Sequence, residues 1–389
     1  MAAEVLSFIA ILSLPAYELR FAVAGIRLNV LDLVLLAAAV TMLLQRHRMK
    51  VGTVMPKRIA VPTLVLILAA TVSVAFAPDT ASALGILKSW FILPALFAYA
   101  IWRSEVPLKT LRTALTVGGT IAALYAIGHF FLTDAWVDYE GVKRAVGFFS
   151  QPNYLALFIA PILTLSIAGL RENSGKLQRA AALFAILSMV VAILLSYSRA
   201  GIITVIVCIP LIALFQYGWK HLVVSLCTGV LLFVAAYVSI PSFQKRFTSI
   251  LDTKSQTTSR TRVEITQASL NMLKSHPFTG VGLGGYQEAY STYRIPDALE
   301  KEVLHPHNVY LAFWTQTGLL GLLAFITLAA TAFLKKLRSS SGEVRAAALA
   351  GVSILIIGFF DTTYWKNDLS LVFWVLVAMA TVKARSYRG

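Results

Sequence analysis

The sequence predicts an all-α integral membrane protein that crosses the bilayer many times. Of its 389 residues, 58% are hydrophobic and 13% are charged, and the mean hydropathy is +0.75. An ordinary soluble protein carries about 25% charged residues, and a single soluble core cannot bury this much apolar surface. These values exclude an ordinary cytosolic enzyme and leave lipid as the solvent for most of the apolar side chains.

The hydrophobic segments predict about twelve spanning helices, each near the roughly 20 residues that a span requires. No segment alternates as a membrane β-barrel strand does, and only helices or closed barrels cross a bilayer. The first segment is short, and the seventh and eighth are separated by a break at 197–200. The predicted spans are 3–17, 28–45, 59–77, 83–102, 108–132, 152–170, 179–197, 200–217, 220–240, 307–334, 344–361 and 367–384.

This pattern divides the chain into three parts: nine helices in 1–240, a polar loop at 241–306 and three helices in 307–389. An even number of spans places both termini on one side. The loops on that side hold about 19 Lys and Arg, against about 7 in the short connections opposite, which predicts cytoplasmic termini. The long loop is excluded from this comparison because long loops translocate largely regardless of charge. It is predicted to face outward.

The net charge of +16 would favour nucleic-acid binding in a soluble protein. In a membrane protein most of these cations are explained as topological anchors, so no nucleic-acid partner is predicted. Cys208 and Cys227 both lie in apolar runs, which argues against a disulfide framework. Two cysteines are also too few for a cysteine zinc site.

A set of outer basic residues does not fit this anchoring rule. Lys88 lies inside the apolar run ALGILKSWFILPAL, and Arg199 lies between two predicted spans. Ionisable groups at membrane depth are expensive and indicate function by default, while snorkelling to the outer headgroups is the alternative. Asp32, by contrast, is expected to be a favourable charge at a helix N-terminus. The full set is Arg20, Arg27, Lys88, Lys143, Arg144, Arg199 and Lys366.

The outward loop is predicted to contain a helix at 259–276, where apolar residues recur at helical spacing and a proline follows the end. Arg260 and Arg262 fall in its first turn, where the helix dipole disfavours cations. A bound anion would relieve this conflict, because free N–H groups and guanidinium both suit phosphate. A solvated basic loop is the other interpretation.

The segment after this helix formally contains G-x-G-x-x-G at Gly280, Gly282 and Gly285. The dinucleotide motif needs a preceding strand and a following helix in a βαβ unit. That context is missing, so the cofactor interpretation is rejected. A flexible turn against the membrane surface is predicted instead.

His305 and His307 flank a proline where the span 307–334 begins. Their i, i+2 spacing is not the i, i+4 spacing of a helical zinc pair, and the sequence offers no clear third ligand. No metal site is predicted. A histidine at the outer end of a spanning helix suits general acid–base catalysis near neutral pH. An interfacial histidine bonded to backbone is the alternative.

Four segments together carry a resemblance to a known family. HPHNVYLAFWTQTGLLG (305–321) contains His307-Asn308, nine residues and Gly-x-x-Gly. It resembles the signature of the O-antigen ligase and polymerase superfamily, which is His, then Asn, Ser or Gln, nine residues and Gly-x-x-Gly, and the lipopolysaccharide O-antigen ligases most of all. The other three are GFFSQPNYLALF (147–158), SYSRAG (196–201) and RVEITQASLNMLKSHPFTGVGLGGY (262–286). All four follow the family order. Two positions depart from the pattern: Leu322-Leu323 replaces Thr-Val, and Thr266 replaces a frequent Trp.

The resemblance implies a GT-C-like fold in the bacterial inner membrane, with a periplasmic loop over an outward cavity. It implies that His307 is the catalytic histidine and that Arg199 and Arg262 hold a lipid diphosphate, with Lys88 adding to that site. Supporting positions are Asn153, Arg260, His305 and Asn308.

The expected reaction is glycan transfer from undecaprenyl diphosphate to a lipid A–core hydroxyl, with inversion and with His307 as the base. Neither a cofactor nor a metal is expected, because the sequence has no Asp-x-Asp pair and arginines can neutralise the leaving diphosphate. Membrane lipids are the other expected partners. A polymerase that uses a second polyprenyl-linked repeat as acceptor is one alternative. A secondary transporter is more distant, because paired half-repeats are not found.

Overall fold

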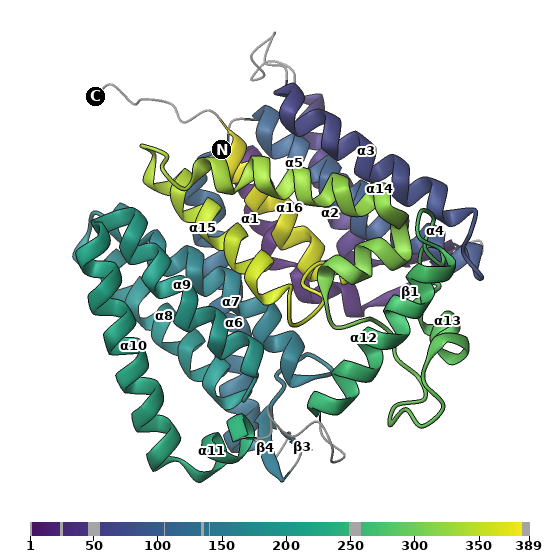
Figure 1. Ribbon diagram of the computed structural model, residues 1–389. Helices are drawn as coiled ribbons and strands as arrows, with labels where there is room; N and C mark the ends of the chain where they lie inside the picture. The colour runs from purple at the N-terminus through teal and green to yellow at the C-terminus, as the bar shows by residue number, and fades with distance from the viewer. Residues whose placement is uncertain are drawn as a thin grey trace.

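The computed structural model describes residues 2–23, 26–45, 55–104, 106–133, 136–139, 141–248 and 258–382. In this part of the chain, helices form one large bundle and short outer elements cover one end of it (Figure 1). The bundle consists of α1 (Ala2–Leu12), α2 (Val30–Leu44), α3 (Lys57–Val74), α4 (Thr80–Ile86), α5 (Leu93–Ser104), α6 (Leu108–Leu132), α7 (Pro152–Ala168), α8 (Lys176–Leu195), α9 (Arg199–Tyr217), α10 (Trp219–Ser239), α14 (Val309–Ala332), α15 (Gly342–Ile357) and α16 (Asn367–Thr381).

The predicted class of helical membrane protein is confirmed. Within the described ranges, seven helices are long and apolar enough to cross a membrane, and α1, α2, α7 and α16 are shorter apolar helices. The number of twelve spans and the GT-C likeness stay predictions. The expected span 3–17 is shorter as a helix. The helix α1 ends at Leu12, and a 3₁₀ turn with Pro15 in its second position follows at Leu14–Glu18.

Two helices depart from regular α-helical geometry near the outer end. The expected span 83–102 joins α4 to α5 through a π-helical turn at Leu87–Ile92, which carries Lys88. Inside α14, Gly318 adopts φ +70° and ψ 179°, so the helix is kinked there. Single π-helical turns inside α-helices occur frequently at functional sites.

Two β-hairpins accompany the bundle and were not predicted. One pairs β1 (Arg20–Val23) with β2 (Ile26–Asn29), and the other pairs β3 (Trp136–Tyr139) with β4 (Val142–Ala145). They lie at the same end as the outer helices α11 (Pro241–Thr248), α12 (Thr258–Ser275) and α13 (Tyr286–Tyr293) (Figure 1). Strands of four residues are too short to produce a recognisable alternating pattern.

The helix predicted at 259–276 is present as α12, which packs with α13 around Ile265, Met272 and Tyr286. The sequence suggested a flexible turn for the glycine-rich segment between them, but this segment is hydrogen-bonded to the bundle. Its backbone donates from Val281 to the Thr315 carbonyl at 2.7 Å and from Leu283 to the Ser73 carbonyl at 3.2 Å. The sequence could not reveal these acceptors, which lie at the end of α3 and near the kink of α14.

A buried ion pair closes the opposite end of the bundle. The Nε of Arg112 lies 2.8 Å from an Oε2 of Glu343, and its Nη2 donates to Asn173 Oδ1 at 3.1 Å. These contacts join the starts of α6 and α15 to the connection that precedes α8. The helices α7, α9, α14 and α16 all begin at the other end, where the outer elements lie.

Replacing Arg112 with methionine is expected to destabilise the protein by about 3–5 kcal/mol, because Glu343 would remain buried without its cation. Lys109→Met is the matched control: Lys109 lies one turn earlier on α6 and is exposed, so its loss should change stability by less than about 0.5 kcal/mol. Unfolding in detergent micelles measures both. Equal stability of the two variants would show that the ion pair does not hold this end together.

Candidate functional site

One buried carboxylate joins its own segment to three distant ones, at the end of the bundle that the hairpins and the short helices cover. Asp361, in the connection between α15 and α16, is 1% exposed. Its Oδ1 lies 2.9 Å from Nδ1 of His307, while its Oδ2 lies 3.4 Å from Nη2 of Arg262 and 3.3 Å from Nδ2 of Asn153. These four residues form what we call the Asp361 cluster. It contains the predicted base, one predicted diphosphate ligand and one predicted supporting residue.

The surroundings of Asp361 keep it ionised. Burial alone would raise the pKa of the carboxyl, but the hydrogen bond with His307, the charge of Arg262 and the Thr362 amide together hold it well below its usual range. An anionic acceptor at 2.9 Å from Nδ1 assigns the proton to that nitrogen of His307. Nε2 is then the basic nitrogen, as in a histidine that an aspartate orients for proton abstraction.

The backbone turns His307 toward Asp361. His307 adopts φ +48°, a left-handed conformation that costs on the order of 1–3 kcal/mol for a non-glycine residue and is concentrated at functional sites. Asn308 then begins α14: its Oδ1 accepts from the amides of Tyr310 and Leu311, each at 3.0 Å. Its Nδ2 donates to the Phe359 carbonyl at 3.1 Å, two residues before Asp361. The His-Asn pair therefore both caps the helix and orients the imidazole.

The glycines of the same signature provide room for the outer loop. A Cβ on Gly318 would overlap the Phe278 carbonyl, and one on Gly321 would overlap the Thr317 side chain. At the kink, the Leu319 amide donates to the Phe278 carbonyl at 3.1 Å. Gly318 thus lets the segment after α12 dock directly on α14, which fixes the loop relative to His307, whereas Gly321 makes room for Thr317 of the same helix.

The two arginines in the first turn of α12 have different partners. Arg262 contacts Asp361 and the Phe360 carbonyl. Arg260 instead pairs with Glu264 at 2.7 Å and donates to the Asp297 carbonyl at 3.4 Å. The structure therefore brings Arg262 to the Asp361 cluster, whereas Arg260 fastens the loop.

Arg199 approaches the same end of α12. Its Nη1 donates to Oγ of Ser259 at 3.3 Å, about one helical turn before Arg262. The predicted break before Arg199 is present: α8 ends at Leu195, Tyr197 has φ +46°, and Ser198 caps α9 by accepting from Gly201.

Lys88 has a carboxylate partner of its own. Its Nζ lies 2.7 Å from Oδ2 of Asp32, which also accepts from Ser89 at 2.8 Å. Asp32 does lie in the first turn of α2, as expected, but it is buried and paired. The structure therefore places the Lys88 ammonium in an ion pair on the π-helical turn, and a role at the diphosphate stays a prediction.

His305 lies between two indoles. Its ring centroid is 6.4 Å from that of Trp90 and 6.5 Å from that of Trp365. Burial lowers the pKa of His305 to about 4, and nearby His307 adds to the decrease. His305 is therefore neutral at pH 7, and His307 is the better general base of the two. Trp90 lies two residues after Lys88, so the π-helical turn reaches the His-Pro-His segment.

The remaining outer cations have varied partners. Lys143 lies 3.9 Å from the Trp136 ring centroid, and Arg20 lies 3.8 Å from Glu18. The Lys366 ammonium does not snorkel: it is buried beside the rings of Tyr17, Phe149 and Tyr154, at 4.6–5.2 Å from their centroids. The side chain of Arg27 lies outside the described residues.

Sequence reasoning missed Asp361 and underused Arg144. Asp361 ends an apolar run in GFFDTTYW. The rule that selects Lys88 and Arg199, which treats ionisable groups at membrane depth as functional candidates, applies equally to a carboxylate at the end of an apolar run. Arg144 was noticed as unexplained and given no role. The structure buries its side chain next to Asn153, at 2.9 Å.

Comparison with known proteins supports the resemblance. Residues 184–326 match the family described as O-antigen ligase, a range that contains Arg199, Arg262 and His307. An uncharacterized protein of Haemophilus influenzae is 27% identical over 209 residues, which cover 48% of this chain and 52% of that protein. The chain thus spans about half the length of this curated relative. The resemblance to the O-antigen ligase superfamily is confirmed.

Proposed function

Taking the O-antigen ligase family as the premise, we propose that this protein transfers a glycan from a polyprenyl diphosphate to an acceptor hydroxyl at the outer face of the bacterial inner membrane. The observation that carries the proposal is the His307–Asp361 pair, with Arg262 on the second carboxylate oxygen. This arrangement joins a base and a cation where a lipid headgroup can reach them.

In the proposed reaction, His307 Nε2 removes the proton of the acceptor hydroxyl as the oxygen attacks the anomeric carbon. The bond between that carbon and the diphosphate oxygen breaks, and the diphosphate leaves with the bonding electrons. A single displacement of this kind inverts the anomeric centre. Asp361 stabilises the imidazolium that forms, and positioned acid–base catalysis contributes about 10²–10⁴-fold to the rate.

The leaving diphosphate accumulates negative charge. Arg199, at the start of α9, and Arg262, near the start of α12, would neutralise this charge. Two guanidinium groups supply the positive charge that Mg²⁺ provides in many glycosyltransferases. We therefore propose metal-independent transfer.

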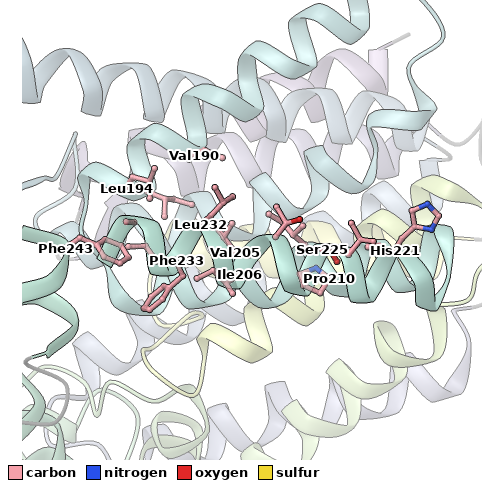
Figure 2. Close-up of a pocket in the computed structure, with 18 of the residues that line it drawn as sticks. Val190, Leu194, Val205, Ile206, Pro210, His221, Ser225, Leu232, Phe233 and Phe243 are labelled. Carbon is pink, nitrogen blue, oxygen red and sulfur yellow. The ribbon is translucent and has the colours of Figure 1, made fainter. Parts of the chain in front are cut away.

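An apolar groove offers a place for the lipid tail of the donor. It lies between α8, α9 and α10 and has a volume of about 750 Å³ (Figure 2). It extends from Ile202, one turn after Arg199, to His221 at the start of α10. A headgroup at Arg199 would direct a polyprenyl chain along it. Residues that line the groove include Val190, Leu194, Val205, Ile206, Leu232 and Phe233.

The proposed orientation follows from charge. The Asp361 cluster lies at the end that carries the long loop, and the predicted cytoplasmic loops, rich in Lys and Arg, belong to the Arg112 end. The positive-inside rule therefore favours a site that faces the periplasm and termini that face the cytoplasm.

Supplying one defined polyprenyl-diphosphate glycan with either of two acceptors distinguishes the candidate activities. Purified protein in nanodiscs, with chelator present, is expected to glycosylate lipid A–core, since the family description and the long outer loop favour a ligase. A longer polyprenyl-linked glycan as the product would identify a polymerase. Counterflow of a small solute in proteoliposomes without either product would favour a transporter and contradict the proposal.

A further inference from the structure

Arg144 is a buried cation for which the proposed reaction has no use. It lies on β4 and is 3% exposed. Its Nε donates to the Ser196 carbonyl at 2.7 Å, and its Nη2 donates to Asn153 Oδ1 at 2.9 Å. One guanidinium therefore joins two segments that both lead to the site.

The first of these contacts fixes the break between α8 and α9. Ser196 follows the last residue of α8, where helix carbonyls have no partner within the helix. The Arg144 guanidinium supplies a charged donor to that carbonyl. The chain then turns through Tyr197 at φ +46° and begins α9 at Arg199. The position of Arg199 thus depends on a turn that Arg144 holds.

The second contact sets the orientation of the Asn153 amide. Because Arg144 donates to its oxygen, the NH₂ group is the side that faces Asp361, at 3.3 Å. The reversed amide would direct an oxygen at a buried carboxylate and remove one of its donors. Arg144 therefore acts on Asp361 through Asn153, and on His307 through Asp361.

We propose that Arg144 is a positioning residue that keeps the diphosphate ligand Arg199 in register with the His307–Asp361 pair. The inference rests on the proposed transfer reaction and adds a coupling between donor binding and the base. It requires arginine, since the planar fork reaches two acceptors in fixed directions, whereas a lysine ammonium is a single point charge.

Arg144→Gln is expected to lower kcat/KM for the donor on the order of 10²-fold, the effect of a misplacement of about 1 Å at a reacting centre. Arg144→Lys should recover only part of the loss. The acid limb of the pH profile should move to higher pH, because a carboxylate with one hydrogen-bond donor fewer attracts the imidazolium of His307 more strongly. In the variant, His307 and Arg262 still face Asp361. The charge of Asp361 also acts on Tyr154 and His305.

Two controls separate positioning from folding. Lys143→Gln removes the neighbouring exposed cation of the same hairpin and should leave kcat/KM unchanged. Arg112→Lys perturbs a buried cation at the opposite end, so it should lower the melting temperature without moving the pH profile. Asn153→Ala combined with Arg144→Gln should lower activity little more than Arg144→Gln alone, since Asn153 acts within the contacts that Arg144 holds.

A shifted acid limb in Arg144→Gln, with both controls unshifted, supports the inference. Wild-type kcat/KM and pH profile in Arg144→Gln would overturn it, as would a loss of activity that only parallels the loss of folded protein, as in Arg112→Lys. If His307→Ala abolishes transfer while Arg144→Gln keeps the wild-type kcat/KM and pH profile, only this inference fails. If the wild type itself transfers no glycan, the proposed function fails.

Discussion

Replacing Asp361 with asparagine is expected to reduce glycan transfer by about 10²–10⁴-fold, as much as removing the base itself. The variant keeps the shape of the side chain and loses the charge that holds the proton on His307 Nδ1 and pairs with Arg262. His307 would then turn or change tautomer. Initial rates with a defined donor and acceptor measure the effect.

Two further variants show whether Asp361 acts through His307. The double variant His307→Ala, Asp361→Asn should be no slower than the slower single variant, because residues that act as a unit are not additive. Asp297→Asn, at an exposed position of the outer loop, serves as the matched carboxylate control and should retain transfer within about twofold. Near-wild-type transfer by Asp361→Asn would exclude it from the mechanism.

The lowered pKa of Asp361 also predicts how stability depends on pH. Because the pKa is lower in the folded state than in the unfolded state, where it is about 3.9, the ionised carboxylate stabilises the protein above that value. This contribution is lost as the pH falls through the folded-state pKa. The melting temperatures of wild type and Asp361→Asn should therefore differ more at pH 7 than in acid, and a constant difference would contradict the assignment.

Removing either arginine of the proposed diphosphate site is expected to lower kcat/KM by about 10²–10³-fold, the usual effect of losing one group that stabilises charge in a transition state. The two variants should differ in their pH profiles. Arg262→Ala takes a cation from Asp361 and should move the acid limb to higher pH. Arg199→Ala should move that limb less, since the guanidinium of Arg199 donates to Ser259 Oγ.

Lys274→Ala tests whether any cation of α12 contributes through general electrostatics. Lys274 is exposed in the last turn of the same helix, so its loss should leave transfer within about twofold of wild type. A similar loss in all three variants would indicate nonspecific attraction of the anionic donor. A similar loss in all three variants that appears only at low salt would indicate long-range electrostatic steering of the donor, because salt screens such steering.

Much of the fold follows from one requirement: in lipid, long apolar segments must form helices that satisfy their own backbone hydrogen bonds. The apolar run at 108–132 became α6 with the same bounds, and the helix expected at 259–276 formed within one residue. The hairpins escaped prediction because their short strands are stabilised by docking at the bundle end. The kink at Gly318 also depends on a partner, the Phe278 carbonyl, that lies outside the helix.

The sequence indicated those residues of the candidate site whose side-chain chemistry is a signal by itself. It did not indicate the residues whose role depends on a distant partner. His307 and Arg262 carried chemical signals of their own, and the structure brings them to one carboxylate. That carboxylate is 54 residues from His307 and 208 from Asn153, so no local pattern connects them. Lys88 stays a predicted diphosphate ligand, and its ammonium pairs with Asp32, 56 positions earlier, which the sequence did not indicate. The pair depends on the contact of α2 with the π-helical turn, where Ser89 also donates to Asp32.

The direct test of this mechanism compares initial rates of glycan transfer by purified wild-type protein and His307→Ala, side by side with chelator present. The assay uses a polyprenyl-diphosphate glycan and lipid A–core in nanodiscs. Catalysis by His307 without a metal predicts that wild type forms product with an inverted anomeric centre and that the variant is slower by about 10²–10⁴-fold. Near-wild-type transfer by His307→Ala would contradict it.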